Sequence, residues 1–315
     1  MTLPTLLIDC DPGLDDAIAL LAAAQLGNLI GITTVNGNIG IEHTTHNALA
    51  IAQATGQDIP VHRGAARPLI APVMDASYVH GPTGLGNVTI PEVTGSVASD
   101  DAVGFILDMA RTVDDLHLIA VGPLTNIALA LRQDPTLPDR LGGFTIMGGG
   151  AHVGNVTATA EFNVWADPEA AAIVFEDFPM VTMVGLDVTH RVLMRTNDRN
   201  RLRDAGGTAA TLAADLLDYA LERAGSIRGT DGAPIHDASA VIAAVAPELF
   251  SGTHHRVVVE LAGTHTRGMT VVDERIGGRD GHETSTANAL VLRDANEQEV
   301  IDAVVDAIIE LDRNA

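Results

Sequence analysis

The strongest constraint on the fold is an alternation, repeated along the chain, between short apolar runs and longer segments with helical spacing. Residues 5–9, TLLID, are predicted to form a buried strand, and the apolar residues that follow recur at the spacing of one helix face. Such alternation predicts an α/β fold in which a mainly parallel sheet carries helices on both faces, in a Rossmann-like arrangement. Further strands are predicted at 29–35, 116–121, 144–147, 180–184, 256–261 and 289–292, and helices at 41–55, 98–112, 124–133, 167–176, 210–224 and 237–246.

The organisation of the chain favours one domain spanning residues 1–315, because no repeat, low-complexity tract or linker divides it. No uninterrupted apolar run reaches about 18 residues, so a membrane span is not expected. The N-terminal MTLPTLLID lacks the features of a signal peptide. With Cys10 as the single cysteine, we expect a reducing, cytoplasmic environment.

The charge is strongly acidic: the net charge is -23, and all 18 basic residues are arginine. Binding to nucleic acid or to anionic membranes needs clustered positive charge, so neither partner is expected. Two explanations of the acidity stay open. One is adaptation to high salt, where screening weakens repulsion between surface charges, and the other is the codon usage of a GC-rich genome.

Polar side chains follow several predicted strands, at the point where each strand ends. Asp9, Asp11, Asp15 and Asp16 follow the first strand, and Asn36 and Asn38 follow the second. VGPLTN and MGGGAHVGN follow the strands at 116–121 and 144–147. Ligands of open α/β sheets bind beyond the carboxyl ends of the strands, so we expect these loops to converge on one crevice.

The crowding of four aspartates needs an explanation. Asp15 and Asp16 can favour a helix N-terminus, but that role does not account for Asp11 on the rigid Pro-Gly turn. Two carboxylates about 4 Å apart repel by roughly 4 kcal/mol at an effective dielectric constant near 20. A divalent cation would reverse this penalty, and an all-oxygen site suits Ca²⁺ or Mg²⁺.

Other site types fit less well. There is no cysteine pair or HExxH helix for zinc, and no GxxxxGKS or GxGxxG motif for a nucleotide phosphate. The DCD sequence at 9–11 is also similar to the start of haloacid dehalogenase phosphatases, but these need a downstream lysine. The chain contains no lysine.

DCDPGLDDAIAL resembles the N-terminal signature of the nucleoside hydrolases, the inosine-uridine-preferring N-ribohydrolase family. The resemblance continues, in family order and spacing, from residue 6 to about 293. Its further motifs are TTVNGN (33–38), HGPTGLG (80–86), VGPLTNIALAL (121–131), IMGGGAHVGN (146–155), AEFNVWADPEAA (160–171) and PIHD (234–237).

The resemblance implies a nucleoside hydrolase fold and a Ca²⁺ ion that holds the ribose diol and the attacking water. Asp11 is implied as the general base, which takes a proton from that water. The implied metal ligands are Asp11, Asp16, Asp237 and the backbone carbonyl of Thr125. The implied ribose-binding residues are Asp15, Asn38, Asn155, Glu161 and Asn163, with Met147 near the sugar.

Recognition of the leaving base is implied for three other residues. His236 in PIHD resembles the histidine that protonates the leaving base, and His80 matches a second pocket histidine. Arg228 resembles a base-contacting arginine. Ala224 departs from the family, whose members often carry a larger polar or aromatic residue there, so the preferred base stays open.

The sequence thus predicts a cytoplasmic, Ca²⁺-dependent hydrolase that splits ribonucleosides into ribose and free base for salvage, with a preference for inosine and uridine or for pyrimidines. The alternatives are an enzyme for another N-riboside, such as nicotinamide riboside, and a Ca²⁺-dependent nucleoside-binding protein without turnover. Family members are usually dimers or tetramers, and we expect one of these homo-oligomers here.

Overall fold

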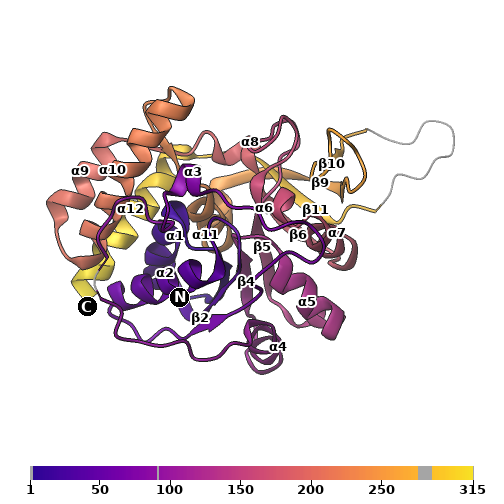
Figure 1. The fold of residues 1–315 in the computed structure, drawn as a ribbon, viewed down its shortest axis with the longest axis horizontal. Helices are drawn as coiled ribbons and strands as arrows, with labels where there is room; N and C mark the ends of the chain where they lie inside the picture. Colours follow the sequence, from indigo (N-terminus) through magenta and orange to yellow (C-terminus); the bar gives the residue numbers. More distant parts are fainter. Residues whose placement is uncertain (1–2, 91, 276–285, 315) are drawn as a thin grey trace.

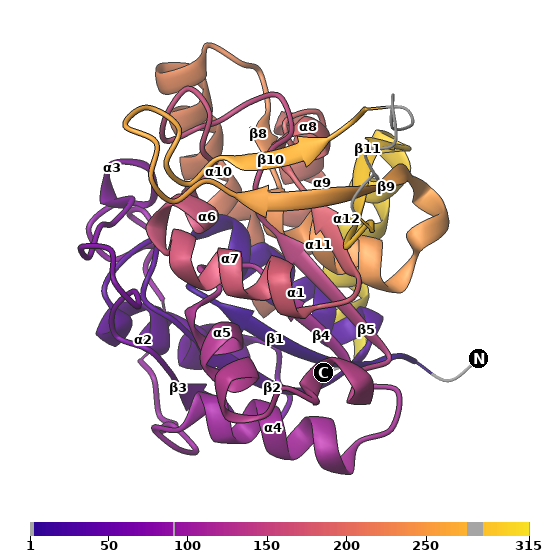
Figure 2. The same ribbon diagram turned by 90° about the vertical axis from the view of Figure 1, so that its right-hand side faces the viewer.

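The computed structural model describes residues 3–90, 92–275 and 286–314. Within these residues, nine strands form one sheet, which is parallel except at one edge (Figures 1 and 2). The strands lie side by side in the order β10 (Thr270–Asp273), β9 (Phe250–Val259), β11 (Ala289–Ala295), β6 (Val181–Val184), β5 (Gly143–Met147), β4 (His117–Ala120), β1 (Thr5–Cys10), β2 (Asn28–Thr34) and β3 (Val61–Arg63).

The central strand β1 shows why the sheet needs cover on both faces. Every residue from Leu6 to Cys10 is fully buried. Because side chains alternate across a strand, Leu6, Ile8 and Cys10 join one core cluster and Leu7 joins the other. A strand buried on both faces reads as a continuous apolar run, as TLLI does.

Helices cover the two faces unequally. The face toward Leu6 has an inner layer, α1 (Leu14–Leu26), α2 (Ile41–Ala54) and α11 (His236–Val245), and an outer layer, α9 (Thr196–Ala205), α10 (Thr208–Arg228) and α12 (Glu297–Asn314). The face toward Leu7 carries α4 (Ala102–Thr112), α5 (Thr125–Gln133) and α7 (Pro168–Asp177). The short elements are α3 (Ser77–His80), α6 (Phe162–Ala166), α8 (Leu186–Thr189), η1 (Leu137–Arg140), η2 (Pro247–Leu249) and the small ladder of β7 (Leu193–Met194) with β8 (Ala233–Pro234).

The predicted α/β fold with a mainly parallel sheet and helices on both faces is confirmed. Each predicted strand and helix is present, with ends that differ by a few residues. The strand predicted at 256–261 begins earlier, at Phe250, and runs antiparallel to both its neighbours. β3, β10, α9 and α12 were not predicted from the sequence. No helix in the described part of the chain is long and apolar enough to span a bilayer.

The parallel strands place the loops of interest at one edge of the sheet. β1, β2, β4, β5 and β6 run in the same direction, so the segments that leave their carboxyl ends are neighbours. Residues of α3, α6 and the start of α1 line one cavity near this edge, and Figure 2 shows α8 on the far side of it from α3. The candidate site lies here.

Candidate active site

Glycines in the loops after β1 and β2 allow these two loops to approach each other closely. A Cβ atom at Gly13 would lie 2.4 Å from His80 Nδ1 and 2.9 Å from Asn38 Nδ2. A Cβ at Gly37 would lie 2.0 Å from Asp11 Oδ2. Glycine at these two positions lets the loops after β1 and β2 pack against each other, so the aspartates and Asn38 share one site.

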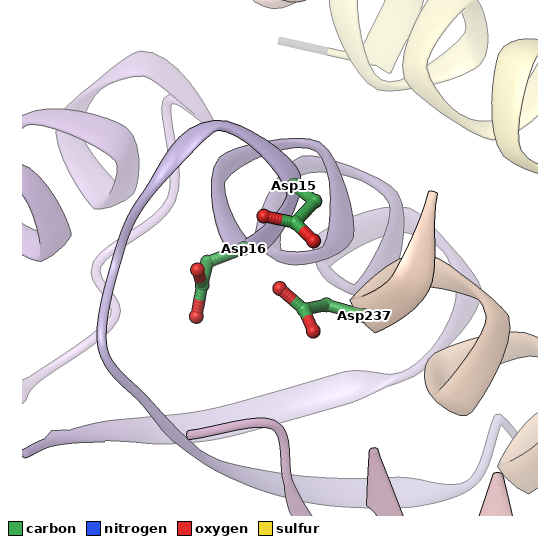
Figure 3. Close-up of side chains that lie close together, drawn as sticks. All are labelled: Asp15, Asp16 and Asp237. Carbon is green, nitrogen blue, oxygen red and sulfur yellow. The ribbon is translucent and has the colours of Figure 1, made fainter. Parts of the chain in front are cut away.

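Three carboxylates meet at the first turns of two helices. Asp15 and Asp16 come from the start of α1, and Asp237 comes from the start of α11. One oxygen from each lies within 4.8 Å of the other two, and Figure 3 shows the carboxylates turned toward a common space. Such a group of oxygen ligands can hold a metal ion.

Asp11 lies beside this group rather than within it. Its backbone N–H donates to Asp16 Oδ1 at 3.1 Å, and its Oδ2 accepts from the Asn38 backbone N–H at 2.5 Å. Its Oδ1 is buried and accepts no hydrogen bond from the described residues. The structure therefore groups Asp15, predicted to bind the sugar, with two predicted metal ligands, while Asp11 adjoins them. The roles of Asp11 and Asp15 stay predictions.

Burial sets the electrostatics of the cluster. It raises the pKa of Asp16 to about 7, with the charge of Asp15 as the next cause. It also raises the pKa values of Asp11 and Asp237 well above the usual range for a carboxyl group, and neighbouring carboxylates add to both shifts. The buried negative charge therefore lacks compensation from the protein, and a bound cation would supply it.

Asp9 is part of the support beneath the site. Its Oδ1 accepts from Thr33 Oγ1 at 2.6 Å and from Asn126 Nδ2 at 2.7 Å. Asn126 also donates to the Thr34 carbonyl and accepts from the Ala65 N–H. Asp9 thus ties β1 to β2 and to the first turn of α5, next to Thr125. Burial raises the pKa of Asp9 to about 7.

Thr125, predicted to offer its backbone carbonyl to a metal, is buried at the start of α5. Its Oγ1 donates to Asp167 Oδ2 at 2.7 Å, and the same oxygen accepts from the Leu69 N–H. The loop before it touches the cluster, because a Cβ at Gly122 would lie 2.7 Å from Asp11 Oδ1. These contacts hold the start of α5 against the strand ends.

One cavity opens next to the aspartates, and most of the predicted site residues line it. The loops after β1, β2, β4 and β5 all contribute, which confirms that they converge. The predicted residues in its wall are Asp15, Asn38, His80, Met147, Asn155, Glu161, Asn163, His236 and Asp237. Asp11, Asp16 and Thr125 do not line the cavity.

The predicted ribose-binding residues from the β5 side are held firmly. Glu161 begins α6 and accepts from the N–H groups of Gly149, Asn163 and Val164. Asn163 donates to the carbonyls of Val121 and Met147, at the ends of β4 and β5. Burial raises the pKa of Glu161 to about 7. Asn155 is exposed.

The two predicted histidines lie in different surroundings. His80 Nδ1 accepts from the Leu14 N–H at 3.1 Å, so its other nitrogen carries the proton, and burial lowers its pKa. His236 Nδ1 lies 2.6 Å from Thr189 Oγ1 in α8, and its ring meets His190 edge to face. Both histidines line the cavity, with His236 next to Asp237.

The cavity lining also contains residues to which the sequence gave no role. Arg228, predicted to contact the base, belongs to α10, but its side chain lies outside the described residues. Arg223 of the same helix lines the cavity, as does Tyr78 of α3. The sequence held a signal for this part of the lining. Residues one and two helical turns before Ala224 lie on the same helix face, and these residues, Ala220 and Leu217, also line the cavity.

Comparison with known proteins places the chain in a family. The family model for inosine-uridine preferring nucleoside hydrolases matches residues 6–302. The chain belongs to the inosine-uridine preferring nucleoside hydrolase family. Its match is longer than the motifs alone indicated, because it extends into α12.

Individual nucleoside hydrolases support the assignment. The chain is 41% identical to the inosine-uridine preferring nucleoside hydrolase of Leishmania major over 86% of this chain and 88% of that protein. It is 39% identical to a pyrimidine-specific ribonucleoside hydrolase of Photobacterium profundum, over 96% and 98%. A purine-preferring ribonucleoside hydrolase from Gardnerella vaginalis shares the fold with a TM-score of 0.91 at 31% identity, over 99% and 100% of the two chains. The three names differ in the base, so overall similarity does not decide base preference.

Proposed function

We propose that this nucleoside hydrolase is a Ca²⁺-dependent enzyme that splits ribonucleosides into ribose and free base for salvage in the cytoplasm, preferring inosine and uridine or pyrimidines. The observation that carries this proposal is a single cavity with a carboxylate cluster at one side and His236 in its wall. A protein that only binds nucleosides needs neither a general base nor an acid for the leaving group.

The residues of the cluster fit a hard divalent cation. Their ligand atoms are oxygens, and Asp11 and Asp15 each have a buried oxygen without a hydrogen-bond partner in the described part of the chain. Asp16 and Asp237, together with Asp11 or Asp15 and the Thr125 carbonyl, would hold the ion. A bound Ca²⁺ would neutralise the cluster and help to fix the sugar diol and the attacking water.

The chain's own residues then divide the work. Asp15, Asn38, Asn155, Glu161 and Asn163 bind the ribose hydroxyls. The carboxylate of Asp11 accepts one proton from the attacking water while the water oxygen bonds to C1′ of the ribose.

Cleavage is completed on the side of the base. The C1′–N bond breaks with its electron pair moving to the base, and His236 donates a proton to the leaving nitrogen. The sugar gains positive charge in the transition state, which nearby carboxylates stabilise.

The test is release of free ribose from uridine, inosine and cytidine in the presence of Ca²⁺, with EDTA-treated enzyme and Asp11→Ala as controls. We expect ribose from at least one nucleoside with Ca²⁺ and strongly reduced release in both controls. Absence of release from all three with Ca²⁺ present would contradict the proposal and favour another N-riboside or a binding protein.

A further inference from the structure

We propose that Arg223 selects the base, by donating hydrogen bonds from its guanidinium to a carbonyl oxygen of the leaving group. The inference rests on the proposed function and deepens it, because it names a residue that determines the base preference. The enzyme would favour uracil and hypoxanthine, which carry such an oxygen, over cytosine and adenine, which carry an amino group at the equivalent ring position.

The first observation is the place of Arg223. It lies on α10, and its side chain lines the cavity together with Ala220 and Ala224 of the same helix. Its Nη2 donates to the backbone carbonyl of Tyr78 in α3, which also lines the cavity. The guanidinium is thereby held between two walls of the cavity, and its orientation is restricted.

The second observation is the absence of a counterion. The protein carries a net charge of -23, and most arginines in the described part of the chain pair with an aspartate or glutamate. Arg223 makes no ion pair with any described carboxylate, and its Nε is buried without a described hydrogen-bond partner. The guanidinium of Arg223 therefore has N–H donors that can bind a ligand.

The third observation is the chemistry of the surrounding wall. Many of the side chains that line the cavity with Arg223 are apolar. They include Val79 of α3 and Leu217, Ala220 and Ala224 of α10, with Leu14, Ile18 and Ile235. A flat heterocycle fits such a wall, and a fixed polar group in an apolar pocket determines which ligand is accepted.

An arginine side chain favours a base with a carbonyl oxygen over a base with an amino group at the same position. A guanidinium is always charged and offers only donors, so it pairs with a carbonyl oxygen and leaves an amino group facing another donor. The leaving base also gains negative charge as the C1′–N bond breaks, and part of that charge moves onto its carbonyl oxygens. The interaction therefore strengthens toward the transition state, so it raises kcat as well as affinity.

The experiment compares Arg223→Gln with the wild type on inosine against adenosine and on uridine against cytidine. Glutamine can turn either an acceptor or a donor toward the base. The ratio of kcat/KM for inosine to that for adenosine, and the ratio for uridine to cytidine, should therefore fall by about ten- to hundredfold, the range for loss of a charged hydrogen bond. Nitrophenyl riboside, whose leaving group resembles neither kind of base, should change little.

The matched control is Arg199→Gln. Arg199 also ties to α10, through Asp218 at 2.8 Å, and its Nε is also buried without a described partner, but it does not line the cavity. This variant should leave both ratios unchanged. Equal losses of Arg223→Gln on all nucleosides and on nitrophenyl riboside would overturn the proposal and make Arg223 a structural clamp between α10 and α3.

Calorimetric titration with the free bases hypoxanthine and adenine separates this proposal from the hydrolase activity, since free bases cannot be turned over. Wild-type protein should bind hypoxanthine more tightly, and Arg223→Gln should lose that preference. The same preference in both proteins would refute the role of Arg223 even if ribose is released. A preference seen without ribose release would support Arg223 while the hydrolase proposal fails.

Discussion

Asp237→Asn should stabilise the protein when metal is removed and destabilise it, relative to the wild type, when Ca²⁺ is present. Asp237 lies in a group of three carboxylates within 4.8 Å of one another, and its side chain contacts that of Asp16. Asparagine has nearly the same volume, carries no charge and can donate its amide to the remaining carboxylate. It is also a poorer ligand for a hard cation.

The expected size follows from the spacing. Two ionised carboxylates 4.8 Å apart repel by about 3 kcal/mol at an effective dielectric constant near 20. Part of the cluster is protonated at neutral pH because burial raises the pKa values, so the gain in EDTA should be about 1 to 2 kcal/mol. With Ca²⁺ at about 100 times its Kd, the wild type should gain about 2.7 kcal/mol.

The assay is urea unfolding at pH 8, in EDTA and in Ca²⁺, of the wild type, Asp237→Asn and Asp108→Asn. Asp108 is exposed on α4, on the opposite side of the sheet, so its variant should respond to Ca²⁺ as the wild type does. If Asp237→Asn is less stable than the wild type in EDTA, the carboxylates do not repel as the spacing indicates. If it gains as much from Ca²⁺ as the wild type, Asp237 is not a ligand.

The remaining predictions concern pH and catalysis. In EDTA, the stability that protonated Asp16 contributes should be complete below pH 3.8 and lost as the pH rises through about 7, its raised pKa in the folded state. Ca²⁺ should make this loss of stability smaller. Melting temperatures from pH 5 to pH 8 measure the loss, and a melting temperature in EDTA that rises with pH would contradict the prediction. Asp11→Ala should lower kcat by at least about 10²-fold while the circular dichroism spectrum stays that of the folded wild type, and a near-normal kcat would remove Asp11 as the base. His236→Ala should slow inosine or uridine cleavage by about 10²-fold or more but affect nitrophenyl riboside much less, whereas equal losses would indicate a structural histidine. Thr189→Val removes the hydroxyl 2.6 Å from His236 Nδ1 and should cost about tenfold in kcat on inosine alone; an unchanged kcat would show that the imidazole needs no such support.

The architecture was predictable from the sequence because the spacing of apolar residues is periodic in both helices and strands. Strands buried on both faces and helices with one apolar face each carry a repeating pattern, and β1 with α1 is a clear case. The helix α12 carries the same signal, with Val300, Val304 and Ile308 buried four residues apart, and was overlooked rather than hidden. Strand direction is different, because the residues of β9 do not encode that it runs against β11.

Only those residues of the candidate site that lie in recognisable sequence motifs were predictable from the sequence. Asp15, Asn38 and His236 lie in short segments whose composition is distinctive, and all three line the cavity. The hydrogen bond from Asn126 to Asp9 joins residues 117 positions apart, and no local pattern reveals it. Arg223 lies in an ordinary amphipathic helix, and only the packing of α10 against α3 shows that it faces the cavity.

The lining of the cavity has parts of different origin, and this has a consequence for enzyme design. One part consists of residues fixed to the ends of β1, β2, β4 and β5, tied together by buried hydrogen bonds such as those of Asp9, and the start of α11 adds His236 and Asp237. Another part consists of α3 and α10, which lie outside the sheet. Exchanging only these two helices between relatives with different base preferences should transplant the preference, because the machinery that breaks the bond is anchored elsewhere.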